Sequence, residues 1–485
     1  MSTLDPSTPV IVGVGQLNRR APDERDAVEL MADACRLALA DAGSPRLSAT
    51  TDLVAVLDGL WSWRDPGRLV ADRIGATGAR TLLTTFGGQT PQSLSGVLAD
   101  RIARGDLGAA IVCGGEINHT RRRARRAGRT LPRTREPEGR KPTERFGAPL
   151  DMGTEHERSR GLVDPLTTYA VIESILMARS ADGPERHMER VGRLWAGFAA
   201  VAATNPHAAD RRGTGAAEIV EVGPANRMVS WPYPKSMCAN NDVDMAAALV
   251  ICSAEVAIAM GVARDRWVFP WVATEADDTN LFSARGALDE SPALADAGRA
   301  ALDATGLTID EITHLDLYSC FPSIVEMTVG ALGIDPDRRL TMTGGLGFAG
   351  AAMNTATLHG LCAMTEGLRR EPGIGLVQGN GGNATHHAFG IYSPEPPRTP
   401  FTHLARDPRL ATRPVAPTDA AGPVQVEGFT VRFDREGPTH AVVSCLTADG
   451  ARAWGHTRSG DAMEWLMSGA FGETATLTSD GRIPG

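Results

Sequence analysis

The residues best suited to chemistry lie in one short stretch, residues 376–393, which read LVQGNGGNATHHAFGIYS. Two adjacent histidines, His386 and His387, stand in its middle. An imidazole can accept a proton near neutral pH because its ordinary pKa is about 6.5. His387 is therefore a candidate general base. The competing interpretation is a pair of hairpin histidines whose ring nitrogens are satisfied by the backbone.

The same stretch is rich in glycine just before the histidines. Three of the four residues 379–382 are glycine, which indicates backbone that takes a positive φ or approaches another group closely. Apolar runs on both sides predict two strands joined by a tight connection. We therefore expect a hairpin whose tip, formed by Asn380, Gly381 and Gly382, lines a cleft. An ordinary glycine-rich turn is the alternative.

The chain contains an internal repeat, and this stretch belongs to its second copy. Residues 32–43 (ADACRLALADAG) and 295–306 (ADAGRAALDATG) are identical at seven of twelve positions. Two strand-like segments repeat at nearly the same separation of 262 to 265 residues: 51–56 matches 313–318, and 108–114 matches 373–379. A near-constant separation over three segments indicates two copies of one β/α unit.

Strands and helices alternate within the first copy. The apolar patterns predict strands at 10–14, 53–57, 81–86 and 111–113, and helices at 26–41 and 91–103. Strands that alternate with helices of this length pair in parallel through right-handed crossovers. The sequence therefore predicts the α/β fold class, with two repeated layered halves.

The chain is long enough for two or three domains, because single cores stop growing at roughly 250–300 residues. Helical patterns at 164–178 and 187–203 do not fit the repeat and predict an insertion. Eight prolines after the second copy indicate a linker, and the alternating pattern beyond them predicts a small antiparallel β domain. The expected order is a first half (1–118), a basic loop and helical insertion (119–225), a second half (226–393, with a strand at 245–251), a linker (394–423) and the β domain (424–485). We expect residues 1–397 to fold alone, because the repeat closes its own core.

Composition excludes several classes of protein. Apolar residues make up 42% of the chain, yet no apolar run approaches the roughly 18 residues of a membrane span. The N-terminus has neither a basic start nor an apolar segment, so we expect a cytoplasmic protein without membrane contact. The seven cysteines are scattered and form no CxxC pair. This spacing predicts reduced, mostly buried thiols, including Cys113 and Cys320, and neither a disulfide framework nor a metal site.

Residues 119–146 carry a strong local charge. They hold eleven Lys or Arg against three Glu, a net charge of +8 within a chain of net charge −9. Such a segment suits a phosphate-bearing partner, and Arg121, Arg122 and Arg123 are the candidate phosphate contacts. Nucleic acid is the less favoured partner, because no aromatic residues interleave with the arginines. The alternative is a solvated loop.

Several phrases, taken in order, resemble the thiolase superfamily. They are IVGVGQ at 11–16, GGQTPQ at 87–92, PYPKSMCANNDVDMAAALV at 232–250, YSCF at 318–321, TGGLGFAG at 343–350 and NGGNATHHAFGIYS at 380–393. Within that superfamily the chain is most similar to type 1 thiolase-like proteins, close to the sterol-carrier-protein thiolases. The resemblance covers residues 8–393. It implies a two-half thiolase fold, acyl-CoA as ligand, and a role in lipid metabolism.

The resemblance also locates the positions that carry thiolase chemistry. Thiolases need a nucleophilic cysteine, a histidine that activates it, and a second cysteine as acid or base. These positions fall on Gly88, Ala351 and Gln378. Tyr318 stands where the family has an Asn or His that supports the oxyanion. The resemblance thus implies an acyl-CoA binding protein without thiolysis or acetyl transfer.

Tyr318 leaves a second kind of chemistry open. A phenol can donate a hydrogen bond to an enolate or thioester oxygen, as a retro-aldol lyase acting on a β-hydroxyacyl-CoA requires. Steroid side-chain aldolases of this superfamily resemble the pattern in part, with His387 as the remaining candidate base. The alternatives are a packed core tyrosine and a non-catalytic acyl-CoA binder or scaffold.

The resemblance extends to the C-terminal β domain. Type 1 thiolase-like proteins carry an additional OB-like domain at this place, and we expect a docking role for it rather than single-strand binding. The family default is a dimer formed through the first half. A monomer is the alternative, because a fused domain can cover that surface.

Overall fold

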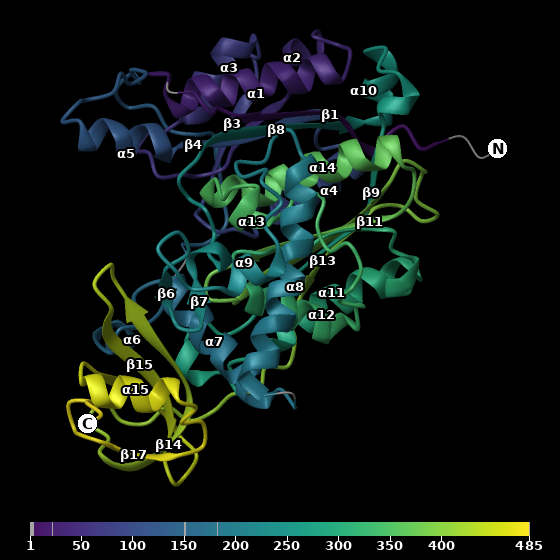
Figure 1. Ribbon diagram of the computed structural model, residues 1–485. Coiled ribbons are helices and arrows are strands. Elements are labelled where there is room, and N and C mark those ends of the chain that lie inside the picture. Colours follow the sequence, from purple (N-terminus) through teal and green to yellow (C-terminus); the bar gives the residue numbers. More distant parts are fainter. Residues whose placement is uncertain (1–3, 22, 150–151, 182, 485) are drawn as a thin grey trace.

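The computed structural model describes residues 4–21, 23–149, 152–181 and 183–484 (Figure 1). Two mixed β-sheets and their helices form the body, and a smaller β domain lies at one end. None of the helices in these ranges has the length and apolar character that a membrane crossing requires.

The first sheet holds six strands in the order β1, β8, β4, β2, β3, β5. Their bounds are Pro9–Asn18 (β1), Asp244–Ser253 (β8), Ala109–Ile117 (β4), Leu53–Val56 (β2), Arg80–Thr84 (β3) and Glu144–Phe146 (β5). β8 runs antiparallel to both of its neighbours, and the other pairs are parallel. The four strands predicted in the first copy are confirmed.

The second sheet repeats this arrangement. Its order is β10 (His314–Asp316), β11 (Gly375–Gly381), β12 (His386–Ser393), β9 (Phe269–Asp277) and β13 (Thr402–Arg406). β10, β11, β12 and β9 follow the order and relative directions of β2, β4, β8 and β1. The predicted α/β fold of two repeated halves is therefore confirmed.

Helices cover both faces of each sheet. The main ones are α1 (Ala27–Asp41), α4 (Thr90–Ala103), α11 (Pro292–Thr305), α12 (Pro322–Leu332) and α14 (Ala356–Arg370). α4 and α14 contact both sheets and lie between them, whereas α1 covers the outer face of the first sheet and α11 that of the second (Figure 1). In β4, Ile111 packs toward α1 and Val112 toward α4 and α14. Because both faces are covered, all nine residues of β4 are buried.

Shorter helices complete the layers: α2 (Leu47–Thr50), α3 (Pro66–Ile74), α10 (Ala254–Ala259) and α13 (Gly345–Phe348). The insertion consists of α5 (Asn118–Arg126), α6 (Glu155–Ser159), α7 (Pro165–Arg179), α8 (Gly183–Thr204) and α9 (Ala216–Val220). α7 begins where Asp164 accepts a hydrogen bond from the Thr167 amide and proline occupies the first helical position. Both helices predicted in the insertion are confirmed.

The C-terminal β domain is tied to the body by a shared sheet. Its elements are β14 (Gly422–Phe433), β15 (Pro438–Leu446), β16 (Arg452–Thr457), α15 (Gly460–Met467) and β17 (Thr474–Leu477). β14 also pairs with β6 (Met228–Ser230), which in turn pairs with β7 (Tyr233–Pro234). Side chains join the two parts as well: Trp454 Nε1 donates to Ser283 Oγ at 2.8 Å, and the buried Arg452 donates to the Ser283 carbonyl at 2.9 Å.

Three segments differ from the sequence prediction. β8 lies in the predicted second half, which begins at residue 226, but it completes the first sheet, so the second half starts after Ser253. The predicted linker 394–423 contains β13, which pairs with β9. The basic segment contains α5 and β5, and β5 extends the first sheet beyond β3. A local apolar or charge pattern identifies a strand or a loop but not the sheet edge that it joins.

Candidate active site

A cavity of about 500 Å³, called here the inner cavity, lies where the two halves meet the insertion. Its walls come from residues 86–88, the first turn of α7, and residues 238–241, 318–321, 346–354 and 380–382. Six of the predicted site positions line it: Gly88, Tyr318, Ala351, Asn380, Gly381 and Gly382. The predicted hairpin tip thus lines a cavity.

Gly88 stands just ahead of α4, and its surroundings leave no room for a side chain. A Cβ atom at Gly88 would lie 2.5 Å from Tyr318 Oη and 2.4 Å from the carbonyl oxygen of Asn380. Such contacts are far shorter than non-bonded atoms tolerate. The backbone here is fixed by the second half, because Asn354 Oδ1 accepts from the Gly87 amide at 2.8 Å and Thr357 Oγ1 donates to the Gly88 carbonyl at 2.6 Å.

Close approach and a positive φ explain the glycines of the hairpin tip. A Cβ at Gly381 would lie 1.9 Å from Gln89 Oε1, and a Cβ at Gly379 would lie 2.9 Å from Gln89 Cα. Gly382 has a φ of +64°. Only glycine therefore lets this hairpin lie against the start of α4, which brings the tip beside Gly88.

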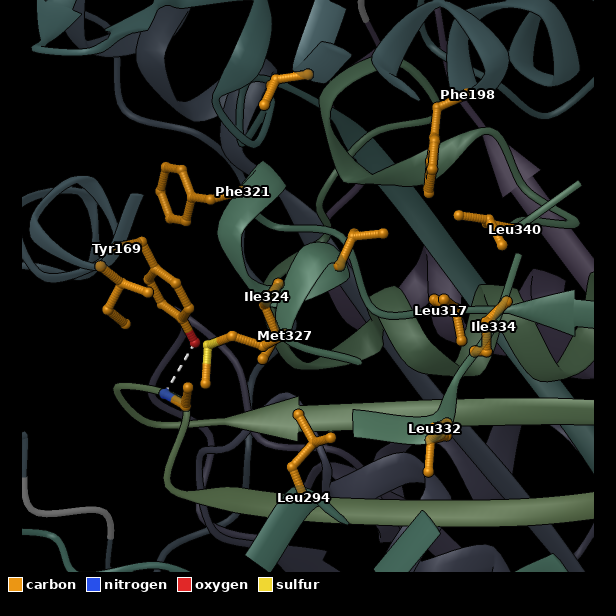
Figure 2. Packing of buried hydrophobic residues seen from close by; sticks show 14 of the residues in the cluster. Tyr169, Phe198, Leu294, Leu317, Phe321, Ile324, Met327, Leu332, Ile334 and Leu340 are labelled. Atoms are coloured by element: carbon orange, nitrogen blue, oxygen red, sulfur yellow. Dashed lines mark hydrogen bonds between the residues drawn. The ribbon is translucent and has the colours of Figure 1, made fainter. Parts of the chain in front are cut away.

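Tyr169 on α7 holds the hairpin tip and is absent from the sequence prediction. Its hydroxyl accepts from Ala384 N at 2.9 Å, the hydrogen bond drawn in Figure 2, and from Asn380 Nδ2 at 2.8 Å. It donates its single proton to the Gly382 carbonyl at 3.3 Å. Asn380 must therefore present its NH₂ to Tyr169, which leaves the buried Asn380 Oδ1 without a hydrogen-bond partner among the described residues.

The scarcity of tyrosine is the one sequence feature that could have indicated Tyr169. The chain has only four tyrosines, and Tyr169 and Tyr318 both line the inner cavity. Tyr169 stacks on Phe321, with ring centroids 5.1 Å apart (Figure 2). In the sequence, however, it stands in the apolar run of α7 and reads as an ordinary core residue.

Tyr318 is half-buried and keeps its proton. Burial raises the pKa of its phenol well above its ordinary value, so the hydroxyl is a neutral donor at physiological pH. Gln378 lies behind it: Gln378 Oε1 accepts from the Tyr318 amide at 3.3 Å and from Thr328 Oγ1 at 3.2 Å. Gln378 is buried and does not line the inner cavity, so it positions the Tyr318 backbone rather than facing a ligand.

Two thiols line the inner cavity, those of Cys238 and Cys320. Burial raises the pKa of each thiol to about 12. The nucleophilic thiolate is therefore scarce at neutral pH. Cys320 lies in the loop between β10 and α12 and is half-buried. Cys113 is fully buried in β4, as expected.

His387 is not available as a base in the inner cavity. It is 1% exposed, does not line the cavity, and its Nε2 lies 3.1 Å from both Ser291 Oγ and the Ala384 carbonyl. Burial, together with the charge of Arg285, lowers the pKa of this imidazole to about 3. His386 instead pairs with Asp277 at 2.7 Å. The structure therefore does not bring the predicted base His387 to the inner cavity. The backbone contacts only one of its ring nitrogens, because Nδ1 has no hydrogen-bond partner among the described residues.

A larger cavity of about 850 Å³, called here the outer cavity, adjoins the inner one. The two share Cys238, Ala239, Asn241 and Met353 as lining residues. Its cationic lining groups are Arg122, Arg212 and Lys235, and its acidic ones are Asp210, Glu218, Glu221 and Asp242. Together the cavities offer one compartment with seven charged lining groups and one mostly apolar compartment, and they meet at Cys238.

The three arginines predicted to contact phosphate have different positions. Arg122 lines the outer cavity and forms an ion pair with Asp242. Arg121 is engaged with the buried Glu116 at 3.0 Å, and Arg123 is exposed; neither lines the outer cavity. Lys235, which the sequence did not single out, is exposed there and forms no ion pair with the part of the chain that the structure describes. It is one of only two lysines in the chain.

No family model and no curated protein sequence matches the chain. Solved structures do match. A monomeric SCP2-thiolase like protein type 1 (STLP1) from Mycobacterium smegmatis superposes with a TM-score of 0.84 at 28% identity, over 99% of this chain and 100% of that one. The chain belongs to the thiolase-like superfamily.

Two further structures share the fold of this thiolase-like chain at lower identity. The Ltp2-ChsH2(DUF35) aldolase matches with a TM-score of 0.61 and 17% identity, over 80% of this chain and 99% of that one. The dimeric peroxisomal thiolase of Saccharomyces cerevisiae matches with a TM-score of 0.59 and 14% identity, over 81% and 99%. Of these three structures, the first spans 99% of the thiolase-like chain, including its C-terminal β domain.

Proposed function

We propose that the chain binds an acyl-CoA thioester in the inner cavity without forming a cysteine intermediate. The observation that carries this proposal is at Gly88, the position that matches the thiolase nucleophile. Tyr318 Oη and the Asn380 carbonyl fill the space that a cysteine side chain would need there. Ala351, which matches the activating histidine, offers no base, and the thiols of Cys238 and Cys320 stay protonated.

The inner cavity has groups that suit a thioester. The phenol of Tyr318 is a neutral donor for the thioester oxygen, and the orphan Asn380 Oδ1 is an acceptor for a hydroxyl or amide proton. The start of α4 adds the positive end of a fourteen-residue helix. An acyl group held against Phe86, Leu166 and Phe321 would bury apolar surface in the same compartment.

The nucleotide part of CoA is assigned to the outer cavity, with Lys235 and Arg122 as phosphate contacts. The four carboxylates of that cavity outnumber its three cations, so general electrostatic attraction does not account for phosphate binding. Specific contacts from Lys235 are needed instead, because this ammonium group has no carboxylate partner among the described residues. Arg122 would have to exchange Asp242 for a phosphate.

Isothermal titration of the full chain with CoA and acetoacetyl-CoA tests this proposal. Saturable binding of both is expected, with tighter binding of the thioester and no thiolysis above background. Lys235→Ala should lower the affinity for both ligands about tenfold, the loss expected for one charge-assisted phosphate contact. Lys141→Ala, the change of the other lysine, is the matched control, since Lys141 is exposed and does not line the outer cavity. Absence of binding, or robust thiolysis, would overturn the proposal.

The second candidate is a retro-aldol lyase, favoured by the pairing of Tyr318 and Asn380. A β-hydroxyacyl thioester presents a carbonyl acceptor and a hydroxyl donor, which match the phenol and the orphan Asn380 Oδ1. In that reaction the β-hydroxyl loses its proton and the Cα–Cβ bond breaks. A carbonyl product leaves, and the enolate, stabilised by Tyr318, takes up a proton. An amide oxygen is a poor base, so the hydroxyl proton must pass to solvent or to the ligand itself.

Turnover of a β-hydroxyacyl-CoA distinguishes a lyase from a protein that only binds acyl-CoA. Formation of a carbonyl product from a β-hydroxyacyl-CoA supports the lyase. Saturable binding of the same compound with no product supports a binder or scaffold. Both outcomes require acyl-CoA binding, so neither can be confused with the absence of an acyl-CoA site.

A further inference from the structure

A third cavity of about 820 Å³, called here the groove, lies away from the inner and outer cavities and shares no lining residue with them. Its walls are α8, α12 and residues 336–340. The apolar part of its lining consists of Leu194, Phe198, Val201, Val329 and Leu340. Figure 2 shows Phe198 and Leu340 at one end of the buried cluster that supports it. Its volume falls within the range of small-molecule sites, roughly 300–1,000 Å³.

Two helical glycines keep the groove open. Gly197 on α8 and Gly330 on α12 line it, and a Cβ atom at either position would meet nothing within 4 Å. Neither has a positive φ. A glycine within a helix destabilises it by about 1 kcal/mol relative to alanine. Neither packing nor backbone geometry requires a glycine at these two positions. Each glycine leaves the groove wider than a residue with a side chain would.

Four guanidinium groups surround the apolar lining, those of Arg190, Arg193, Arg338 and Arg339. Arg338 donates to the Ile309 carbonyl at 3.0 Å and Arg339 donates to the Thr341 carbonyl at 3.1 Å, contacts that leave their charge uncompensated. The acidic lining groups are Asp337 and Glu326. Burial, and then the neighbouring Glu173, raise the pKa of Glu326 well above its ordinary value, which favours its neutral form. The groove is thus positive within a chain of net charge −9.

Behind the groove, Glu173, His187 and Glu326 come close enough to hold a metal ion, but their hydrogen bonds argue against one. Arg190 donates to His187 Nδ1 at 2.8 Å, so the imidazole proton sits on Nε2. That proton is donated to Glu173 Oε1 at 2.5 Å. A metal at Nε2 would force the proton onto Nδ1, facing the donor group of Arg190. The cluster therefore fixes the wall of the groove.

We propose that the groove binds an amphipathic organic acid, with its apolar body on the lining and its carboxylate on Arg193 and Arg339. Guanidinium groups bind carboxylates through paired, charge-assisted hydrogen bonds, which suits these two exposed side chains. The apolar lining alone would accept any hydrophobic molecule, and the arginines select the anionic ones. This site is separate from the proposed acyl-CoA site.

Isothermal titration of the full chain with sodium decanoate tests the proposal, with decan-1-ol as the uncharged match. Decanoate should bind at one saturable site, at least about tenfold more tightly than the alcohol, and more weakly as salt rises. The double variant Arg193→Gln and Arg339→Gln should lose about tenfold or more in decanoate affinity. Arg46→Gln, the change of an exposed arginine in the first half, should have no effect.

Filling the groove gives an independent test. Gly197→Leu should abolish decanoate binding and leave the melting temperature unchanged or higher, because leucine favours the helix and meets open space. Gly460→Leu, the same change at the exposed first residue of α15, should leave binding intact. Ala351→Leu, which narrows the inner cavity, should do likewise. Unchanged decanoate affinity in Gly197→Leu, loss in Ala351→Leu, or equal affinity for decan-1-ol would overturn the proposal.

Discussion

The two halves join their matching strands by very different connections. In the second half, β11 returns to β12 through residues 382–385 alone, whereas in the first half β4 reaches β8 through residues 118–243. Both connections reach the inner cavity: the short one begins at Gly382 of the hairpin tip, and the long one supplies Tyr169 and Cys238. The repeated sheets thus form the frame, and the site is built from what differs between the copies.

The largest effect is expected from removing residues 408–485, which the long connection depends on. Ser174 on α7 accepts from the Phe429 amide at 2.9 Å, and in the second half Phe282 also stacks on Trp454, with centroids 5.9 Å apart. We expect the truncated chain to be insoluble, measured by soluble yield. This revises the sequence-based expectation that residues 1–397 fold alone. Trp454→Ala is the milder form, with an expected loss of about 3–5 kcal/mol, and the half-buried Trp465→Ala is its control.

Gly88→Cys tests whether the space between Gly88 and the hairpin tip has room for a nucleophile. The new Cβ would collide with backbone at Asn380 as well as with Tyr318, so we expect a loss of about 3 kcal/mol in the free energy of unfolding. Thiolysis of acetoacetyl-CoA should not appear. Gly78→Cys is the control, because Gly78 is exposed and a Cβ there meets nothing within 4 Å. A stable, thiolytic Gly88→Cys variant would show that the surrounding groups move aside easily.

Tyr318→Phe asks whether the site does more than bind. If β-hydroxyacyl-CoA is cleaved, we expect kcat to fall about 10²-fold with KM nearly unchanged, as for one lost oxyanion donor. Tyr392→Phe is the control, because that hydroxyl donates to Gln92 Oε1 away from the inner cavity. Full activity in Tyr318→Phe would remove this phenol from the chemistry.

Tyr169→Phe breaks the contact through which the long connection holds the short one. Asn380 Nδ2 and the Ala384 amide would both lose their acceptor, with an expected loss of about 2 kcal/mol in the free energy of unfolding. Acyl-CoA affinity should fall as the hairpin tip loosens. Chemical denaturation measures the first effect and titration the second. Unchanged affinity would mean that the tip keeps its shape without α7.

The smallest expected effect is a pH dependence at Asp164, which caps α7 and lines the inner cavity. Burial alone would raise the pKa of this carboxyl, but hydrogen bonds from Arg432 and Thr167 outweigh burial and lower it. Its contribution to stability is therefore present above the unfolded pKa, near 3.8, and is lost as pH falls through the lower folded value. Asp164→Asn keeps the cap and should cost below about 1 kcal/mol at pH 7, as for a solvent-screened pair. The difference in melting temperature should shrink as pH falls below 3.8 and disappear only below the folded pKa.

The sequence predicts the frame well because the frame is local. Period-2 and period-3.6 patterns identify β4, α4 and their copies, and near-constant separation relates the two halves. The site depends on pairings that no local pattern records. The strand β12 places its two histidines on opposite faces, and only the packing of α11 decides that His387 is buried away from the inner cavity. Likewise, nothing in the apolar run of α7 distinguishes Tyr169 from its neighbours in the core.

The pairing of Ser230 in β6 with Arg432 in β14 sets an order of events during synthesis. These partners lie about 200 residues apart, so a ribosome making roughly 5–20 residues per second needs roughly 10–40 s to supply the second after the first. During that interval the edge of β6 and the outer side of α7 have no cover. The strands of both halves have already emerged by then, but the long connection is not yet fixed. The long connection therefore gains its partner strand only when β14 has been made.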